Sequence, residues 1–136
     1  VCVDTNHHGH PVTFLAVERG IHAISWDFRF PSPLPVPEGT FDIVHARWSW
    51  WGHTVDDIPG ALAECVRLAR PGGSVMLTHP ARTWGNEKVS ALKAAANKLK
   101  AKMPGLSVDY GSERLVVTKL ASGEEGESIE GRGCSE

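Results

Sequence analysis

Hydrophobic and polar positions along this chain form two patterns, short apolar runs and longer stretches with a helical repeat. Short apolar runs bounded by turn residues such as Gly, Pro, Asp and Ser predict β-strands. The run "SVMLT" is continuous enough to predict a strand buried on both faces. The segments predicted as strands are residues 1–3, 21–26, 41–46, 74–78, 106–109 and 114–120.

Apolar residues spaced three and four positions apart predict helices over 12–19, 56–70 and 86–103. Asp57 is the expected N-cap of the middle helix, and Asn86 is the expected N-cap of the last one. Four prolines predict that the stretch between 28 and 39 is an extended loop. The expected apolar stripe of the last helix is Val89, Leu92, Ala96, Leu99 and Met103.

Strands alternate with helices through most of the chain, and two closely spaced strands close it. This order predicts an α/β fold, with a mostly parallel sheet, helices on its faces and a C-terminal antiparallel hairpin at its edge. Residues 1–120 would form this domain. Residues 121–136 carry five acidic side chains and one basic side chain, so we predict an acidic disordered tail.

Composition narrows the class of protein further. The chain has 136 residues, of which 41% are hydrophobic and 22% charged, as in an ordinary globular domain. Its net charge of −2 does not suggest a nucleic-acid partner, and no apolar run is long enough to span a membrane. Three scattered cysteines do not suggest a disulfide framework, which favours a reducing compartment such as the cytoplasm or an organelle.

Two motifs carry a resemblance to a known family. The segment "LAECVRLARPGGSVML" at 62–77 joins a helix, an R-P-G-G turn and an apolar strand, and "LPVPEGTFDIVHA" at 34–46 places a loop before F-D-I-V. Together they resemble the class I S-adenosylmethionine-dependent methyltransferases (methyltransferase type 11). The resemblance implies a Rossmann-like methyltransferase sheet, S-adenosyl-L-methionine as cofactor, and methyl transfer to an oxygen or nitrogen acceptor.

A narrower likeness involves Glu18-Arg19-Gly20, His45 and Arg70–Gly73. These residues resemble a plant methyltransferase-like family, many of whose members are Golgi membrane proteins. That likeness would make the Golgi a candidate location and a glycan or small molecule the acceptor. The chain departs from the plant pattern because Trp48, Trp50 and Trp51 stand where that family has cysteine and one tryptophan.

The opening "VCVDTNHHGH" fits the implied fold in two registers. It is either the first strand with an unusual glycine-poor loop, or the end of the second strand with Asp4 at its tip. We favour the second register because it leaves no internal element missing. The first strand and the glycine-rich cofactor loop would then precede residue 1, and the domain would be N-terminally truncated. A sheet edge exposed in this way predicts a dimer or a partner chain.

Candidate cofactor residues lie at two strand ends. Asp4 is placed to accept hydrogen bonds from the ribose hydroxyls, although it would equally serve as a turn residue. The resemblance places Trp26, Asp27 and Phe28 beside the adenine, and strand-end packing is their alternative role. The histidines at 7, 8 and 10 invite a metal site, but no cysteine or carboxylate pattern completes one, so we expect a solvated loop and no metal.

Candidate catalytic and substrate residues follow the strand at 41–46, because ligands of open α/β sheets bind beyond the carboxyl ends of strands. His45 and His53 are the candidate bases for removing a proton from the acceptor. The tryptophans would alternatively cover exposed core. The residues expected to line the substrate pocket or its rim are Arg47, Trp48, Trp50, Trp51, His79 and Trp84.

Two functions remain open at this point. The chain is a methyltransferase or part of one, or it is a non-catalytic methyltransferase-like module for binding or assembly. The three tryptophans would also suit an interface in the second case, because tryptophan is enriched at binding hot spots.

Overall fold

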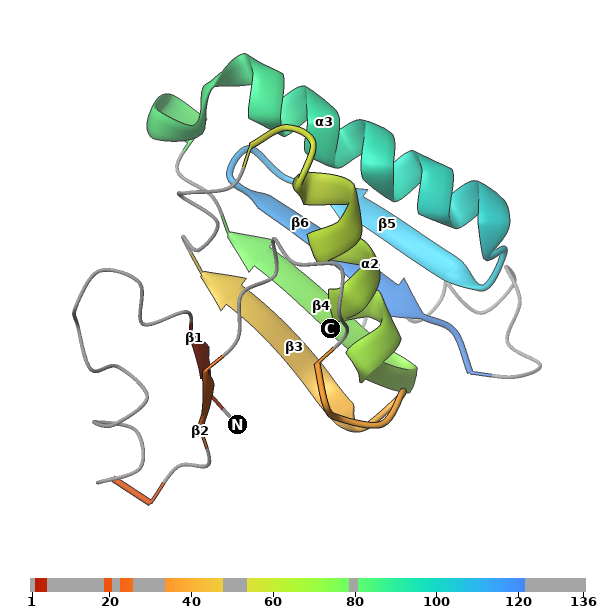
Figure 1. Cartoon of the computed structure of the whole chain (residues 1–136). Helices are drawn as coiled ribbons and strands as arrows, with labels where there is room; N and C mark the ends of the chain where they lie inside the picture. The colour runs from red at the N-terminus through yellow and green to blue at the C-terminus, as the bar shows by residue number, and fades with distance from the viewer. Residues whose placement is uncertain are drawn as a thin grey trace. The chain divides into compact units, whose positions relative to one another are not determined.

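The computed structural model describes residues 2–4, 19–20, 23–25, 34–47, 54–78 and 81–121, with backbone alone at 2–4, 23–25, 47 and 81–84. The chain divides into two compact units, residues 1–34 and 35–136. Each unit is described here by itself (Figure 1).

The first unit contains two short parallel strands, β1 (Cys2–Asp4) and β2 (Ala23–Ser25). Cys2 pairs with Ala23 and Asp4 pairs with Ser25. Both predicted strands are therefore present, and Asp4 is the last residue of β1. The helix expected at 12–19 lies outside the described residues except for Arg19.

The second unit is a four-stranded sheet in the order β3-β4-β6-β5. Strands β3 (Phe41–Arg47) and β4 (Ala69–Thr78) are parallel, while β6 (Arg114–Lys119) pairs antiparallel with both β4 and β5 (Leu106–Tyr110). This confirms the prediction of a sheet whose first strands are parallel and which closes with a C-terminal antiparallel hairpin. The hairpin does not simply extend the edge, because β6 inserts between β4 and β5.

Helices α2 (Ile58–Leu68) and α3 (Ala81–Lys102) cover the same face of this sheet (Figure 1). Strands β4 and β6 contribute alternate residues to the core, as the two-residue period of a strand requires. The largest fully buried side chains are Ile58, Leu62, Leu92, Leu115, Val66, Val75, Val117 and Cys65.

The expectation that 74–78 is buried on both faces is wrong. Val75 and Leu77 are buried under the helices, but Ser74, Met76 and Thr78 on the opposite face are only half-buried. Neither described helix covers that face, and Ile43 of β3 is 67% exposed on it. The sheet therefore offers a partly open surface opposite α2 and α3.

The boundaries of α2 differ from the prediction at both ends. The helix begins at Ile58 with Asp57 in the N-cap position and Pro59 in the first turn, but the Asp57 side chain does not cap it. That carboxylate instead accepts hydrogen bonds from the backbone and hydroxyl of Thr54, at 2.9 and 3.1 Å. The helix ends at Leu68, because Ala69 is already extended and begins β4.

Helix α3 contains a break at Gly85, whose φ of 78° and ψ of 158° are not helical. A helical run follows from Asn86, where the sequence predicts the start. Leu92 and Ala96 of the expected stripe are buried, and Val89 and Leu99 are half-buried. Met103 is exposed, since it lies just beyond the helix end at Lys102.

Polar side chains tie α2 to its surroundings. Arg67 makes a two-pronged ion pair with Glu64, at 2.6 and 2.8 Å, as residues three positions apart on a helix can. The same guanidinium donates to the carbonyl oxygen of Val36 (3.0 Å) and so holds the loop before β3. The ammonium of Lys119 donates to the carbonyl oxygens of Val66 (3.1 Å) and Ala69 (2.8 Å) at the C-terminal end of α2.

Candidate functional site

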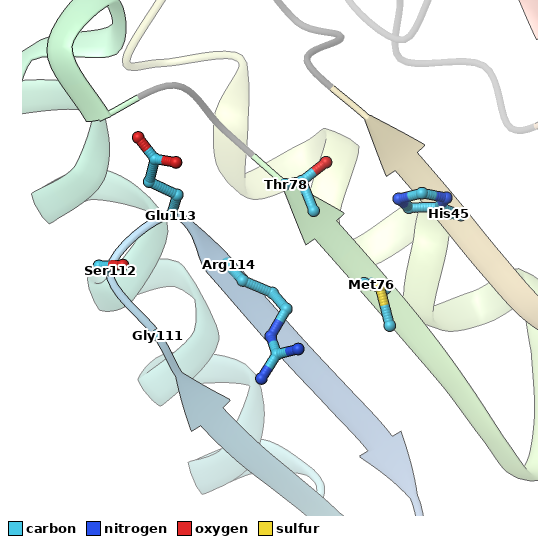
Figure 2. A pocket seen from close by; sticks show the side chains of 7 residues that line it. All are labelled: His45, Met76, Thr78, Gly111, Ser112, Glu113 and Arg114. Atoms are coloured by element: carbon cyan, nitrogen blue, oxygen red, sulfur yellow. The ribbon is translucent and has the colours of Figure 1, made fainter.

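A pocket of about 530 Å³ opens on the sheet face opposite the two helices (Figure 2). It lies where β3 and β4 end and where the β5–β6 hairpin turns. The residues that line it are His45, Met76, Thr78, Gly111, Ser112, Glu113 and Arg114.

Strand pairing explains why these side chains meet. His45 of β3 pairs with Met76 of β4, and Thr78 of β4 pairs with Arg114 of β6. Paired residues direct their side chains to the same face, and so do residues two apart on one strand. Three neighbouring strands therefore bring an imidazole, a thioether, a hydroxyl and a guanidinium to one surface.

The hairpin turn forms one wall of the pocket. The backbone amide of Gly111 donates to the carbonyl oxygen of Arg114 (2.7 Å), which closes the turn around Ser112 and Glu113. The hydroxyl of Tyr110, at the end of β5, lies 3.0 Å from the carbonyl oxygen of Lys93 on α3. It also lies 3.1 Å from Oδ1 of Asn97, so the helix anchors the strand that enters the turn.

The polar groups of the pocket differ in their surroundings. His45 is exposed, while the Oγ1 atom of Thr78 is buried and has no hydrogen-bond partner among the residues that the structure describes. Buried hydroxyls usually have a partner, so an unpaired one beside a pocket suits a bound polar ligand. In Figure 2 the carboxylate of Glu113 points away from the guanidinium of Arg114, and Met76 lies between Arg114 and His45.

Of the residues predicted to act in catalysis or acceptor binding, His45 is the one whose side chain the structure places in the pocket. Arg47 is the last residue of β3, where its backbone alone is described. Trp84 has a described backbone within α3. The predicted residues outside the described part of the chain are Trp48, Trp50, Trp51, His53 and His79.

The predicted cofactor residues lie in the first unit. Asp4 pairs with Ser25 at the carboxyl ends of β1 and β2. Trp26, Asp27 and Phe28 follow directly in the sequence but lie outside the described residues, as do the histidines at 7, 8 and 10. Among the side chains that the structure describes, no group of three His, Cys, Asp or Glu residues is arranged to hold a metal ion.

Sequence reasoning missed Met76, Thr78 and the turn residues 111–114. The hairpin itself was predictable, but its insertion beside β4 is a long-range pairing that local pattern does not encode. The sequence did contain one signal of a site here, the adjacent charged residues Glu113 and Arg114 at the expected turn. A hairpin turn does not require charged side chains for its geometry, so their presence could have indicated a function.

Burial changes the chemistry of two other groups. Burial, with a smaller contribution from the charge of Glu64, raises the pKa of the Cys65 thiol to about 12. Partial burial also raises the pKa of Tyr110. Cys65 is on the buried side of α2 and serves as a packing residue of the core. In the part of the chain that the structure describes, no helix is both long and apolar enough to cross a membrane.

Comparison with known proteins shows which domain family and which fold this chain resembles. Residues 16–77 match the family model described as "Methyltransferase domain". The matched segment includes β2, β3, α2 and nearly all of β4, and therefore contains His45 and Met76. A search among curated proteins gave no match.

Solved structures of low sequence identity share the fold. A candidate S-adenosyl-L-methionine-dependent methyltransferase from Methanococcus maripaludis is 12% identical with a TM-score of 0.63, over 90% of this chain and 67% of that one. A SAM-dependent methyltransferase from Methanosarcina mazei is 11% identical with a TM-score of 0.56, over 88% and 81%.

A third neighbour has ligands. The T. thermophilus 16S rRNA N2 G1207 methyltransferase, in complex with AdoMet and guanosine, is 12% identical with a TM-score of 0.52. It matches 92% of this chain, which spans 36% of that enzyme. These similarities show a class I, Rossmann-like methyltransferase fold, and the chain is shorter than each of these neighbours.

Proposed function

We propose that this chain, which matches a methyltransferase family model over residues 16–77, transfers a methyl group from S-adenosylmethionine to an oxygen or nitrogen acceptor bound beside His45. One observation carries the proposal. The pocket that contains His45 lies at the carboxyl ends of the parallel strands β3 and β4, where open α/β sheets bind their ligands.

The strand pairing in the first unit supports a cofactor site made from this chain's own residues. Asp4 and Ser25 are paired at the carboxyl ends of two parallel strands, and residues 26–28 follow Ser25 directly in the sequence. A carboxylate in this position suits the ribose hydroxyls, and the aromatic residues 26 and 28 suit the adenine ring. Asp4, Trp26, Asp27 and Phe28 are therefore the residues proposed to hold S-adenosylmethionine.

The chemistry assigns His45 the role of base. S-adenosylmethionine supplies an electrophilic methyl group, whose bond to sulfur breaks as the acceptor lone pair bonds to the methyl carbon. The acceptor proton must leave, and we assign its removal to the imidazole of His45, which is exposed and lines the pocket. Thr78 supplies a hydroxyl that can fix the acceptor, and the half-buried Met76 supplies an apolar floor.

Two narrower proposals come from the sequence. The plant-family resemblance at Glu18-Arg19-Gly20, His45 and Arg70–Gly73 suggests a small molecule or glycan as acceptor. The non-catalytic alternative is not favoured, because both the family match and the structural neighbours point to methyltransferases.

A methyl-transfer assay tests the proposal. The chain is incubated with saturating S-adenosylmethionine and a panel of phenols, carboxylic acids and amines, and products are sought by mass spectrometry. We expect a methylated product whose rate falls about 100-fold or more in His45→Gln, the size of a general-base contribution.

The matched control is Lys100→Gln, which changes an exposed side chain on α3 and should leave the rate unchanged. Absence of product from every acceptor class would contradict the proposed activity of this chain. Equal rates for His45→Gln and the parent would contradict the role of His45.

A further inference from the structure

The side chain of Arg114 lines the pocket. Within the described residues it makes no ion pair, whereas Arg67 and Arg70 are each paired with a carboxylate. In Figure 2 its side chain extends across the face of β6, away from Glu113 and toward the floor formed by Met76. An unpaired guanidinium in a pocket is a site for an anion, since its forked donors match carboxylate and phosphate oxygens.

Strand positions set the distance between this cation and the candidate base. His45 is on β3 and Arg114 is on β6, with β4 between them. Neighbouring strands lie about 4.8 Å apart, and Arg114 pairs with Thr78, two residues along β4 from the Met76 that pairs with His45. The two side chains therefore arise about 12 Å from one another. Met76, half-buried and apolar, occupies the intervening surface.

We propose that the methyl acceptor is a carboxylate-bearing molecule whose carboxylate binds Arg114 while its methyl-accepting atom lies at His45 and its apolar body lies over Met76. This inference rests on the proposed methyltransferase function. It adds the class of acceptor, a monoanion whose charged group and reacting atom are separated by an apolar spacer.

The charge of the pocket favours carboxylate over phosphate. Glu113 also lines the pocket and adds a carboxylate to the hairpin turn, although its side chain points away from the guanidinium of Arg114 (Figure 2). A phosphate monoester carries close to two negative charges at neutral pH, so Glu113 would repel it more strongly than a carboxylate. The buried Oγ1 atom of Thr78, paired in register with Arg114, offers the same ligand a further hydrogen bond.

Binding of a defined probe pair tests this inference without the cofactor. The chain, labelled with ¹⁵N, is titrated with 3-(4-hydroxyphenyl)propanoate and separately with its neutral amide, and backbone amide shifts are followed by NMR. We expect the carboxylate to shift the signals of residues 111–114 and of His45, and to bind at least about tenfold more tightly than the amide.

Two variants make the result specific. Arg114→Gln should abolish the preference for the carboxylate, and Lys100→Gln, which removes an exposed cation of α3, should retain it. Both positions are exposed, so dispersed spectra are expected for each variant. A third titration uses the phosphate monoester of the same length.

Equal binding of the carboxylate and the amide would overturn the inference, as would an unchanged preference in Arg114→Gln. Tighter binding of the phosphate would overturn the choice of carboxylate. These outcomes do not depend on methyl transfer. A chain that methylates neutral acceptors and shows no carboxylate preference would retain the proposed function and lose this inference alone.

Discussion

A β-carbon on Gly73 would stand 2.7 Å from the backbone oxygen of Asp42, a distance that non-bonded carbon and oxygen atoms do not tolerate. It would also stand 2.9 Å from the backbone oxygen of Arg70. The F-D-I-V and R-P-G-G motifs are thus in backbone contact, and an ion pair between Arg70 and Asp42 joins their side chains. The register of β3 on β4 shifts at this point, between Phe41 and Ile43.

Gly73→Ala is therefore expected to destabilise the protein by about 1–3 kcal/mol, because backbone atoms must move to admit the methyl group. The matched control is Gly60→Ala on α2, where a β-carbon would meet nothing within 4 Å. That change should stabilise by about 0.5–1 kcal/mol, since alanine suits a helix better than glycine. Urea unfolding of the two variants measures both effects. Equal urea midpoints for Gly73→Ala and Gly60→Ala would contradict the close backbone contact at Gly73.

Much of the fold was predictable because its signals are local. The R-P-G-G turn is an example. Gly72 has a φ of 83°, which favours glycine, and a β-carbon on Gly73 would clash with the backbone oxygens of Asp42 and Arg70. The stop of α2 at Leu68 was missed, because Ala69 continues the helical pattern but pairs with Phe41 of β3 instead. Tertiary pairing overrides helix propensity at such boundaries.

The two arginine ion pairs should differ in their contribution to stability. Arg67 and Glu64 are 27% and 13% exposed, and Arg67 also holds the Val36 carbonyl. Arg67→Gln is expected to cost about 1–3 kcal/mol because it leaves partly buried acceptors without their charged donor.

Arg70 and Asp42 are 50% and 77% exposed, so their ion pair is solvated and contributes less. Arg70→Gln should cost under about 1 kcal/mol. The comparison requires only the free energies of unfolding of the two variants. A larger loss in Arg70→Gln than in Arg67→Gln would contradict the assignment of Arg67 as the anchor of the loop before β3.

The buried thiol of Cys65 should be inert in the folded protein. Its pKa of about 12 exceeds the ordinary 9.0, so at pH 8 its thiolate fraction is about a thousandfold lower than that of an unfolded cysteine. In a Cys2→Ser, Cys134→Ser background, reaction with a disulfide reagent should follow the rate of unfolding. Rapid reaction under native conditions would contradict the burial of this thiol.

The same shift predicts a pH dependence of stability. The folded pKa of Cys65 lies above the unfolded one, so the folded protein binds the proton more tightly. Its contribution to stability is complete below pH 9 and is lost as the pH rises toward about 12. Urea unfolding across this range should show a decline that is smaller in Cys65→Ala, and an identical decline would contradict the account.

The anchor of the hairpin turn gives a prediction about the pocket. Tyr110→Phe removes the hydroxyl that bonds to Lys93 and Asn97 but keeps the ring, which lies 5.6 Å from the Lys93 ammonium. We expect a loss of about 0.5–1.5 kcal/mol in stability and faster hydrogen exchange at the amides of 111–114. Unchanged exchange there would show that α3 does not position the turn.

Only part of the candidate site followed from sequence. His45 was a candidate because it lies near the end of β3, and ligands of open α/β sheets bind beyond the carboxyl ends of the strands. Thr78 and Arg114 were not found, because their meeting depends on β6 pairing antiparallel with β4. That pairing brings Thr78 opposite Arg114, 36 positions later in the chain, and the local sequence around either residue does not predict it.

Binding of S-adenosylmethionine tests the central claim most directly. Calorimetric titration of the chain should give saturable binding, competed by S-adenosylhomocysteine, that weakens at least about tenfold in Asp4→Ala, the loss expected for charged hydrogen bonds to the ribose. Lys100→Gln should bind as tightly as the parent chain. No binding at cofactor concentrations of about 1 mM would contradict the claim that this chain works as a methyltransferase.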